Sequence, residues 1–253
     1  MNKWILGARP RTLPAAIAPV VVAVAIAYPD FNFINALLAL IVGLALQIAV
    51  NYANDYSDGI KGTDTERIGP TRLVASGLAN AEEVKQAAIL AFGIGGVAGL
   101  YLSIRTSYWL IAIGAAAIIA AWRYTGGKNP YGYFGLGEVF VFVWFGLAAV
   151  LGTVYAQTNA LSFADVILAA GAGSFACALL VVNNLRDIPS DTTAGKRTLA
   201  VRLGDARTRL LYSALVFTGF GSSAVVAAAS LLISGTDYPL WAGAGVVASI
   251  VAH

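Results

Sequence analysis

Long apolar stretches alternate with short polar segments along the whole chain, and each stretch approaches the length of a membrane-spanning helix. Such a helix needs about 20 predominantly apolar residues, with about 17 to 25 as the usual range. Eight stretches fit, at residues 12–28, 33–50, 87–103, 107–122, 134–155, 164–182, 210–233 and 239–253. The pattern predicts an all-α, polytopic transmembrane bundle, and we expect residues 1–253 to form a single integral membrane domain.

The last apolar stretch, PLWAGAGVVASIVAH, reaches the end of the sequence without a polar boundary. We therefore expect the sequence to be truncated at its C-terminus and a ninth span to follow the eight visible ones. Runs rich in Gly and Ala, such as GIGGVAG and IGAAAIIAA, let helices approach closely in lipid, which predicts a tight bundle.

The amino-acid composition indicates a membrane protein and argues against disulfide-based and histidine-based sites. Apolar residues make up 58% of the chain, the mean hydropathy is +0.75, and charged residues make up only 11%. An ordinary soluble domain has about 25% charged residues. The single cysteine, Cys177, excludes a disulfide within the chain. The single histidine, His253, argues against a histidine metal site or a Ser-His-Asp triad.

The basic residues are distributed unevenly between the two sets of loops. If the N-terminus is cytoplasmic, 15 of the 16 Lys and Arg residues lie on the cytoplasmic side, and only Arg105 lies outside. This bias predicts a cytoplasmic-membrane protein with its N-terminus and its polar clusters facing the cytoplasm. The formal net charge of +3 follows from this topology, so no nucleic-acid partner is expected.

Two clusters of acids and amides end the second and the sixth predicted spans. The first cluster contains Asn51, Asn54, Asp55, Asp58 and Asp64, and the second contains Asn184, Asp187 and Asp191. The clusters align when Asp58 is placed on Asp191, 133 residues apart (191 − 58). We interpret this correspondence as a duplication of a four-helix unit, which gives two pseudo-repeated halves.

The spacing within each cluster indicates a cation site. Residues four apart share one helix face, so Asn54 can converge with Asp58, and Asp187 with Asp191. Oxygen ligands without Cys or His suit a hard cation, Mg²⁺ before Ca²⁺. Two such pairs facing each other would hold two Mg²⁺ around a diphosphate. Solvated loop residues are the alternative, but polar groups at membrane depth usually mark function.

Several other side chains are candidates for the same site. The cations that could grip the remaining phosphate oxygens are Arg72, Lys128, Lys196 and Arg197. Tyr124 precedes Lys128 by four residues, across Gly126-Gly127, and could add a hydroxyl. Glu138 lies inside the fifth span, where it either hydrogen-bonds a polar substrate or pairs with a cation of the bundle.

Together these motifs resemble the UbiA superfamily of intramembrane aromatic prenyltransferases. The likeness rests on an NDxxD cluster ending one span, a DxxxD cluster four spans later, and a Tyr-x-x-x-Lys between them. Three segments, GARPRTLPAAIAPV, NYANDYSDGIKGTD and NNLRDIPSDTTAGKRTLAVRLG, are similar to the branch of the superfamily that prenylates 1,4-dihydroxy-2-naphthoate in menaquinone biosynthesis.

The resemblance implies a nine-helix bundle around a central cavity and a role for each matching residue. The four acids Asp55, Asp58, Asp187 and Asp191 would be catalytic. The Mg²⁺ ligands would be Asn54, Asp58, Asp187 and Asp191, supported by Asn51, Asp55, Asn184 and Glu138. The diphosphate would be bound by Arg72, Tyr124, Lys128, Lys196 and Arg197. Asp64 stands six residues after Asp58 and would have a supporting role, either behind the metal ligands or in ordering its loop.

The implied reaction is Mg²⁺-dependent transfer of a polyprenyl chain from polyprenyl diphosphate to 1,4-dihydroxy-2-naphthoate, with decarboxylation to demethylmenaquinone. Another acceptor, such as 4-hydroxybenzoate, homogentisate or a chlorophyllide, stays open. A secondary transporter would also fit duplicated halves with acids at membrane depth. A CDP-alcohol phosphotransferase is a third possibility, although SDGIKGTD lacks the Ala-Arg which that family places after Asp-Gly.

Overall fold

The computed structural model describes residues 2–63 and 70–234, and within these ranges the chain consists of helices joined by loops, with no strand. The helices are α1 Lys3–Ala8, η1 Pro10–Thr12, α2 Pro14–Ala27, α3 Phe33–Lys61, α4 Ala81–Arg105, α5 Trp109–Arg123, η2 Tyr131–Phe134, α6 Gly137–Val141, η3 Phe142–Ala148, α7 Ala149–Thr158, α8 Phe163–Arg186, α9 Ile188–Thr193 and α10 Leu199–Ser234. The all-α prediction is confirmed.

Five helical segments are long and apolar enough to cross a membrane on their own. They are α3, α4, the continuous α6–η3–α7 segment Gly137–Thr158, α8 and the Leu199–Ala229 part of α10. The segments Lys3–Thr12 and Pro14–Ala27 form a sixth span if counted together, bent by 48°, and α5 is a shorter apolar helix. Seven of the eight predicted stretches therefore fall on helices, and stretch 239–253 lies outside the described residues.

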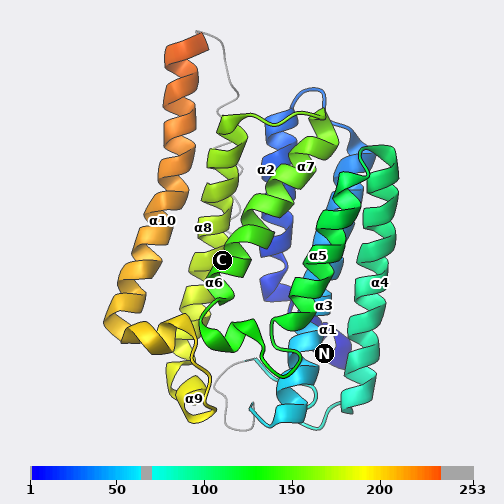
Figure 1. Cartoon of the computed structure of the whole chain (residues 1–253), viewed down its shortest axis with the longest axis vertical. Helices are drawn as coiled ribbons and strands as arrows, with labels where there is room; N and C mark the ends of the chain where they lie inside the picture. Colours follow the sequence, from blue (N-terminus) through cyan, green and yellow to red (C-terminus); the bar gives the residue numbers. More distant parts are fainter. Residues whose placement is uncertain (1, 64–69, 235–253) are drawn as a thin grey trace.

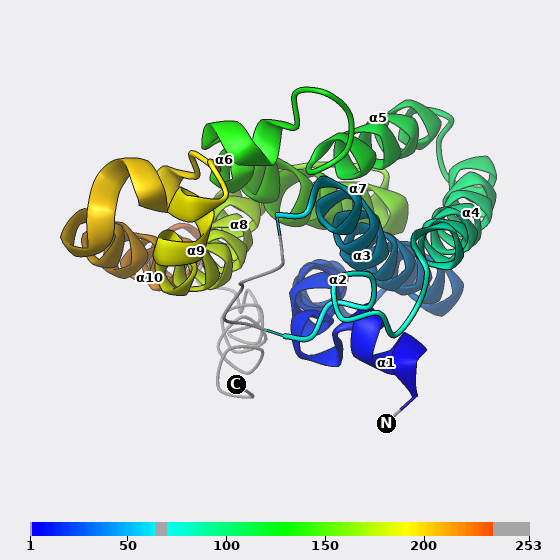
Figure 2. The same cartoon turned by 90° about the horizontal axis from the view of Figure 1, so that it is seen from below.

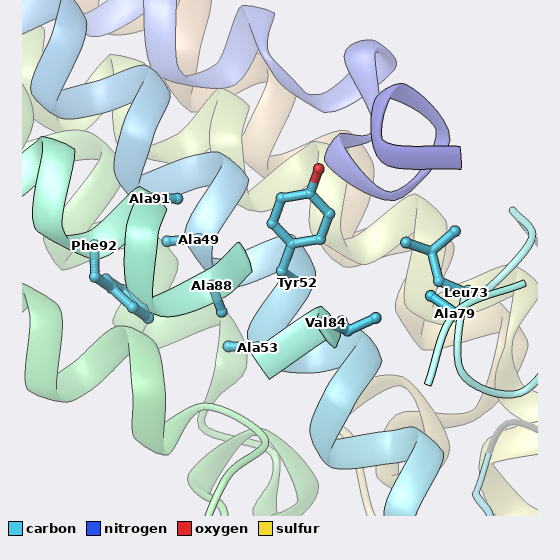
Figure 3. Packing of buried hydrophobic residues seen from close by; sticks show 9 residues of the cluster. All are labelled: Ala49, Tyr52, Ala53, Leu73, Ala79, Val84, Ala88, Ala91 and Phe92. Atoms are coloured by element: carbon cyan, nitrogen blue, oxygen red, sulfur yellow. The ribbon is translucent and has the colours of Figure 1, made fainter. Parts of the chain in front are cut away.

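The helices pack through small residues. Between α3 and α4, Ala49 and Ala53 meet Ala88 and Ala91, as Figure 3 shows, so the two backbones lie close along their length. The same cluster extends to α1, where the Tyr52 hydroxyl donates to the carbonyl of Trp4 over 2.6 Å. This contact fixes the short N-terminal helix against the C-terminal half of α3.

A second close contact joins η3 to α8. The segment η3 is π-helical, and a Cβ added at Gly146 would lie 2.5 Å from the Cα of Gly173. Only glycine permits this approach, because a methyl group at that distance overlaps the facing backbone. The contact places η3 and the aromatic residues that it carries directly beside α8.

The helix ends that carry the two polar clusters lie together at one end of the bundle. The C-terminal ends of α3, α5 and α8 lie there with α1, α9 and the beginnings of α4 and α10, at the bottom of Figure 1. Seen from that end, α4 and α10 lie on opposite flanks, with α3, α7 and α8 between them (Figure 2). The helix that carries the first cluster, α3, packs along α4, and α8, which leads into the second cluster, packs along α10.

Candidate active site

A cavity of about 410 Å³ lies between the helices and has a polar end and an apolar end. The charged and amide residues that line its polar end include Arg9, Asn51, Asn54, Asp58, Arg72, Asn184, Arg186, Asp191 and Lys196, and Thr125, Tyr124 and Tyr133 add hydroxyl groups. On α3 the lining extends from Asp58 to Ala39, nineteen residues away, or about 28 Å of helix. The apolar end includes Leu102 and Leu110. The cavity therefore provides room for a charged head and a long apolar tail.

Asp58 is the electrostatic centre of the polar end. Its side chain is only 2% exposed, yet two cations reach the same oxygen, Oδ2. The Nζ of Lys196 lies 3.1 Å away and the Nη2 of Arg72 lies 3.6 Å away. The other oxygen, Oδ1, accepts a hydrogen bond from the hydroxyl of Tyr133. Because buried carboxylates are costly when unpaired, this arrangement holds Asp58 in place as a charged group.

Lys196 links the two clusters, although they are far apart in the sequence. The chain turns after α9, where the backbone N–H of Lys196 donates to the carbonyl of Asp191 over 2.8 Å. From that turn the lysine side chain reaches Asp58, 138 residues away. Asp191 is 8% exposed and lines the same cavity as Asp58. The structure thus brings an acid from each cluster to the polar end of one cavity.

Asp55 holds the backbone of a loop rather than facing the cavity. Its carboxylate is fully buried and accepts from the backbone N–H groups of Leu73 and Val74 at 2.7 and 3.1 Å. The same loop carries Arg72. Gly59 gives the loop room, because a Cβ there would lie 2.5 Å from Val74. Asp55 therefore positions the arginine that reaches Asp58.

The remaining polar residues of α3 are fixed by neighbouring segments. The Oδ1 of Asn54 accepts from the hydroxyl of Thr125 over 2.7 Å. The Nδ2 of Asn51 donates to the carbonyl of Ala8 at 2.9 Å and to the hydroxyl of Thr12 at 3.0 Å. These contacts tie the end of α3 to the loop after α5 and to the N-terminal segment.

Tyr124 follows α5 and faces the cavity beside the start of α6. A Cβ added at Gly137 would lie 3.3 Å from its hydroxyl, so the glycine makes space for the ring. Burial raises the pKa of Tyr124, and the nearby carboxyl of Glu138 raises this pKa further. The phenol consequently keeps its proton at neutral pH and can donate a hydrogen bond into the cavity.

Five of the sequence-predicted residues that the structure describes do not line the cavity, namely Asp55, Lys128, Glu138, Asp187 and Arg197. Lys128 and Arg197 are exposed and do not line it. Asp187 is buried at 2% exposure, but it forms a two-pronged pair with Arg186 at 2.7 and 2.9 Å and does not line the cavity either. Asp64 lies outside the described residues.

Sequence reasoning missed Tyr133 and Thr125 as site residues. Tyr133 donates to Asp58, and the ammonium groups of Lys61 and Lys196 lie 5.0 and 4.8 Å from the centre of its ring. Both missed residues stand near glycines in YTGGKNPYGY, where the chain leaves a span. These glycines mark the segment as a loop at the end of a span, but nothing in the sequence indicates that this loop contacts Asp58.

The donor set fits Mg²⁺ that is shared with a phosphorylated ligand. Within residues 2–63 and 70–234, no three acidic, His or Cys side chains form a group that could enclose a metal. Mg²⁺ typically takes only one or two carboxylates together with waters and substrate phosphates. One carboxylate from each cluster, Asp58 and Asp191, together with the neutral oxygen donors nearby, meets that requirement.

Comparisons with known proteins agree with this architecture. The model of the UbiA prenyltransferase family matches residues 16–253. A 1,4-dihydroxy-2-naphthoate octaprenyltransferase of Mycobacterium tuberculosis is 55% identical over 216 residues, which cover 85% of this chain and 74% of that protein. A protein of the same name from Escherichia coli is 41% identical over 222 residues, covering 84% and 72%. A UbiA homolog from Archaeoglobus fulgidus, bound to DMAPP and Mg²⁺, superposes with a TM-score of 0.73 at 14% identity, covering 99% of this chain and 85% of that one.

Proposed function

Because the chain belongs to the UbiA prenyltransferase family, we propose that it transfers a polyprenyl chain from polyprenyl diphosphate to 1,4-dihydroxy-2-naphthoate, with loss of the carboxyl group. The observation that carries this proposal is the cavity, which has acids and cations at one end and apolar residues along its length. The charged end suits a diphosphate, and the apolar length of the cavity suits a polyprenyl tail.

The diphosphate binds at the polar end in this proposal. Lys196 and Arg72 already converge on Asp58 and can turn to the phosphate oxygens, and the Tyr124 hydroxyl can donate to them. Asn54, Asp58 and Asp191 line the cavity and are the residues that would hold Mg²⁺. When bound, Mg²⁺ neutralises the negative charge that develops on the leaving diphosphate.

The reaction breaks one carbon–oxygen bond and forms one carbon–carbon bond. The allylic C–O bond breaks with its electron pair leaving on the diphosphate, where Lys196 and Arg72 stabilise the growing charge. The acceptor ring attacks the allylic carbon at the position that bears the carboxylate. The carboxyl then leaves as CO₂, and its bonding electrons restore the aromatic ring. The product is the quinol form of demethylmenaquinone.

The apolar walls protect this chemistry. An allylic cation reacts readily with water, so a site enclosed by membrane-spanning helices suppresses hydrolysis. Aromatic rings at the cavity, including the stacked pair Tyr131 and Phe140 with centroids 3.8 Å apart, offer electron-rich faces to such a cation. Basic residues gather at this end, with Arg72, Arg186 and Lys196 in the cavity lining and Lys61 at the end of α3, which supports its placement on the cytoplasmic side.

One experiment tests the reaction and the acceptor together. The protein, reconstituted in lipid nanodiscs with Mg²⁺, is given one labelled polyprenyl diphosphate and a mixture of aromatic acids. The mixture contains 1,4-dihydroxy-2-naphthoate, 4-hydroxybenzoate and homogentisate, and products are identified by mass. We expect one main product, with the mass of the prenylated naphthoate less CO₂. A prenylated benzoate as the main product would overturn the acceptor assignment, and no prenylated product would overturn the activity.

A further inference from the structure

Glu138 is a buried acid whose position the reaction outlined above does not explain. It stands at the start of α6 and is only 8% exposed. Its Oε1 accepts a hydrogen bond from the Nδ2 of Asn184 over 2.9 Å. Its Oε2 is enclosed and has no hydrogen-bond partner among the described residues. A carboxyl group in such a setting is costly to bury, which marks a functional constraint.

Other buried acids near the cavity are compensated in ways that Glu138 is not. Asp58 has two cations, Asp187 has Arg186, and Asp55 accepts from two backbone N–H groups. For Glu138 the neutral amide of Asn184 is the one side-chain donor that the described part of the chain supplies. The hydrogen bond that holds the amide of Asn184 is therefore the function that the structure indicates for the buried carboxyl group of Glu138.

The contact determines how Asn184 faces the cavity. Asn184 lines the cavity near the end of α8, and its N–H group is turned towards Glu138. The oxygen of the same amide, Oδ1, is left as a hydrogen-bond acceptor on the opposite side. Asn51 is the residue of the first cluster that aligns with Asn184. Its Nδ2 likewise donates hydrogen bonds within the protein, to the carbonyl of Ala8 and the hydroxyl of Thr12.

We propose that the Oδ1 of Asn184 accepts a hydrogen bond from a ring hydroxyl of the aromatic acceptor, and that Glu138 is the positioning residue which orients this amide. The proposal rests on the prenyl-transfer function proposed above. The cavity that Asn184 lines is also lined by Phe140 of α6, by Leu180 one turn earlier on α8, and by Tyr124. Leu180 and Tyr124 meet at Gly137, beside Glu138. These flat and apolar surfaces suit an aromatic ring, and a single amide oxygen among them suits a phenolic hydroxyl.

The position of Asn184 favours the acceptor over metal. It lies on α8 and is tied to Glu138 of α6, whereas Asp191 lies on α9, beyond the break at Asp187. Mg²⁺ needs all its ligands at about 2.0–2.1 Å, a requirement better met by side chains that are not held on separate helices. An acceptor bound at Asn184 would instead lie deeper in the cavity than the diphosphate, where the acceptor ring can meet the allylic carbon.

Steady-state kinetics of the reconstituted protein test this assignment, with both substrates and Mg²⁺ varied separately. For Asn184→Ala we expect the KM for the dihydroxynaphthoate to rise about fivefold to tenfold, the loss of one neutral hydrogen bond. The KM for polyprenyl diphosphate and the Mg²⁺ activation curve stay unchanged. Glu138→Leu has the same effect, and the double variant is no worse than either single one. Asn129→Ala, in an exposed loop outside the cavity, is the control.

A conservative substitution of Glu138 distinguishes a role in orienting Asn184 from a role in folding. Glu138→Gln keeps an oxygen that can accept from Asn184, so it recovers most of the affinity for the acceptor that Glu138→Leu loses. If Glu138→Leu does not fold, Asn184→Ala and Glu138→Gln still decide the question. A second probe is an acceptor that lacks one ring hydroxyl, for which we expect wild type and Asn184→Ala to have equal KM.

Several results would overturn the inference. An unchanged acceptor KM in Asn184→Ala would contradict it, and a shifted Mg²⁺ curve would make Asn184 a metal ligand instead. Additive losses in the double variant would show that Glu138 acts independently of Asn184. These outcomes are distinct from failure of the proposed function, which would appear as absence of prenylated naphthoate in the wild-type protein and would count against both proposals.

Discussion

Replacement of Lys196 by methionine is the perturbation for which the structure gives the clearest magnitude. The lysine is 6% exposed, and its Nζ lies 3.1 Å from Oδ2 of Asp58. With an effective dielectric constant of about 20, two unit charges at that distance attract by about 5 kcal/mol before desolvation is counted. Arg72 remains 3.6 Å from the same oxygen and compensates part of the loss. We expect a net loss of about 3 kcal/mol, since breaking a buried pair typically costs about 3–5 kcal/mol.

The same lysine is expected to stabilise the departing diphosphate. Removal of one preorganised electrostatic donor typically lowers kcat by about 10²–10³. We therefore expect Lys196→Met to reduce kcat/KM by about 10²-fold or more and to lower the thermal stability of the purified protein. Addition of Asp58→Asn to Lys196→Met removes the uncompensated acid, so stability recovers while activity does not.

Diphosphate release in nanodiscs, normalised to folded protein, is the assay. Lys128→Met is the matched control, since that lysine is exposed and does not line the cavity. We expect it to keep at least about a third of wild-type activity, a change within about 0.7 kcal/mol. The reasoning is refuted if Lys196→Met stays within threefold of wild type, or if Lys128→Met loses as much as Lys196→Met.

Four further predictions concern the loop, the hydroxyl donor, the helix crossing and the metal. Asp55→Asn is expected to destabilise the protein by about 2 kcal/mol, because the charged acceptor of two backbone N–H groups is lost. We also expect faster proteolysis within residues 70–79, and an unchanged proteolysis rate would contradict this prediction. Tyr133→Phe should lower kcat by about tenfold with little change in melting temperature, since Asp58 loses a donor; equal kcat would refute it. Gly146→Ala should reduce folded yield sharply while Gly114→Ala, with open space at its Cβ, should not, and equal yields would count against the crossing. Chelation with EDTA should abolish prenyl transfer and Mg²⁺ should restore it, whereas full activity in EDTA would exclude the metal.

The helices were predictable because lipid leaves few alternatives. A chain of this hydropathy has to satisfy its backbone hydrogen bonds within each segment, so apolar runs of the right length become helices. The boundaries were less predictable, because polar residues extend the helices. The apolar stretch 33–50 is part of a helix that continues to Lys61 and carries the whole Asn51–Asp58 cluster.

The site was predictable only in part, since sequence gives residue types but not directions. Repeat spacing identified Asp58 and Asp191, and both line the cavity. The same spacing selected Asp187, yet the helix break there turns its carboxylate to Arg186. Lys128 is a candidate through the Tyr-x-x-x-Lys motif and Arg197 through its place beside Lys196, but neither feature fixes the side on which a loop residue lies.

Contacts between distant segments were beyond the reach of a single sequence. The bond from Tyr133 to Asp58 spans 75 residues, and the bond from Asn184 to Glu138 spans 46. Both arise because α6 and the loop before it fold back against the ends of α3 and α8. Glu138 itself was noticed as a charge inside a span, but its partner depends on the helix arrangement.

The central claim is that one acid from each half of the chain acts at a single diphosphate site. It is tested most directly by Mg²⁺-dependent diphosphate release and product mass in nanodiscs, compared for wild type, Asp58→Asn and Asp191→Asn at equal amounts of folded protein. We predict that wild type forms the decarboxylated prenyl product and that each single variant loses it by at least about 10²-fold. Wild-type rates in either variant would contradict the claim.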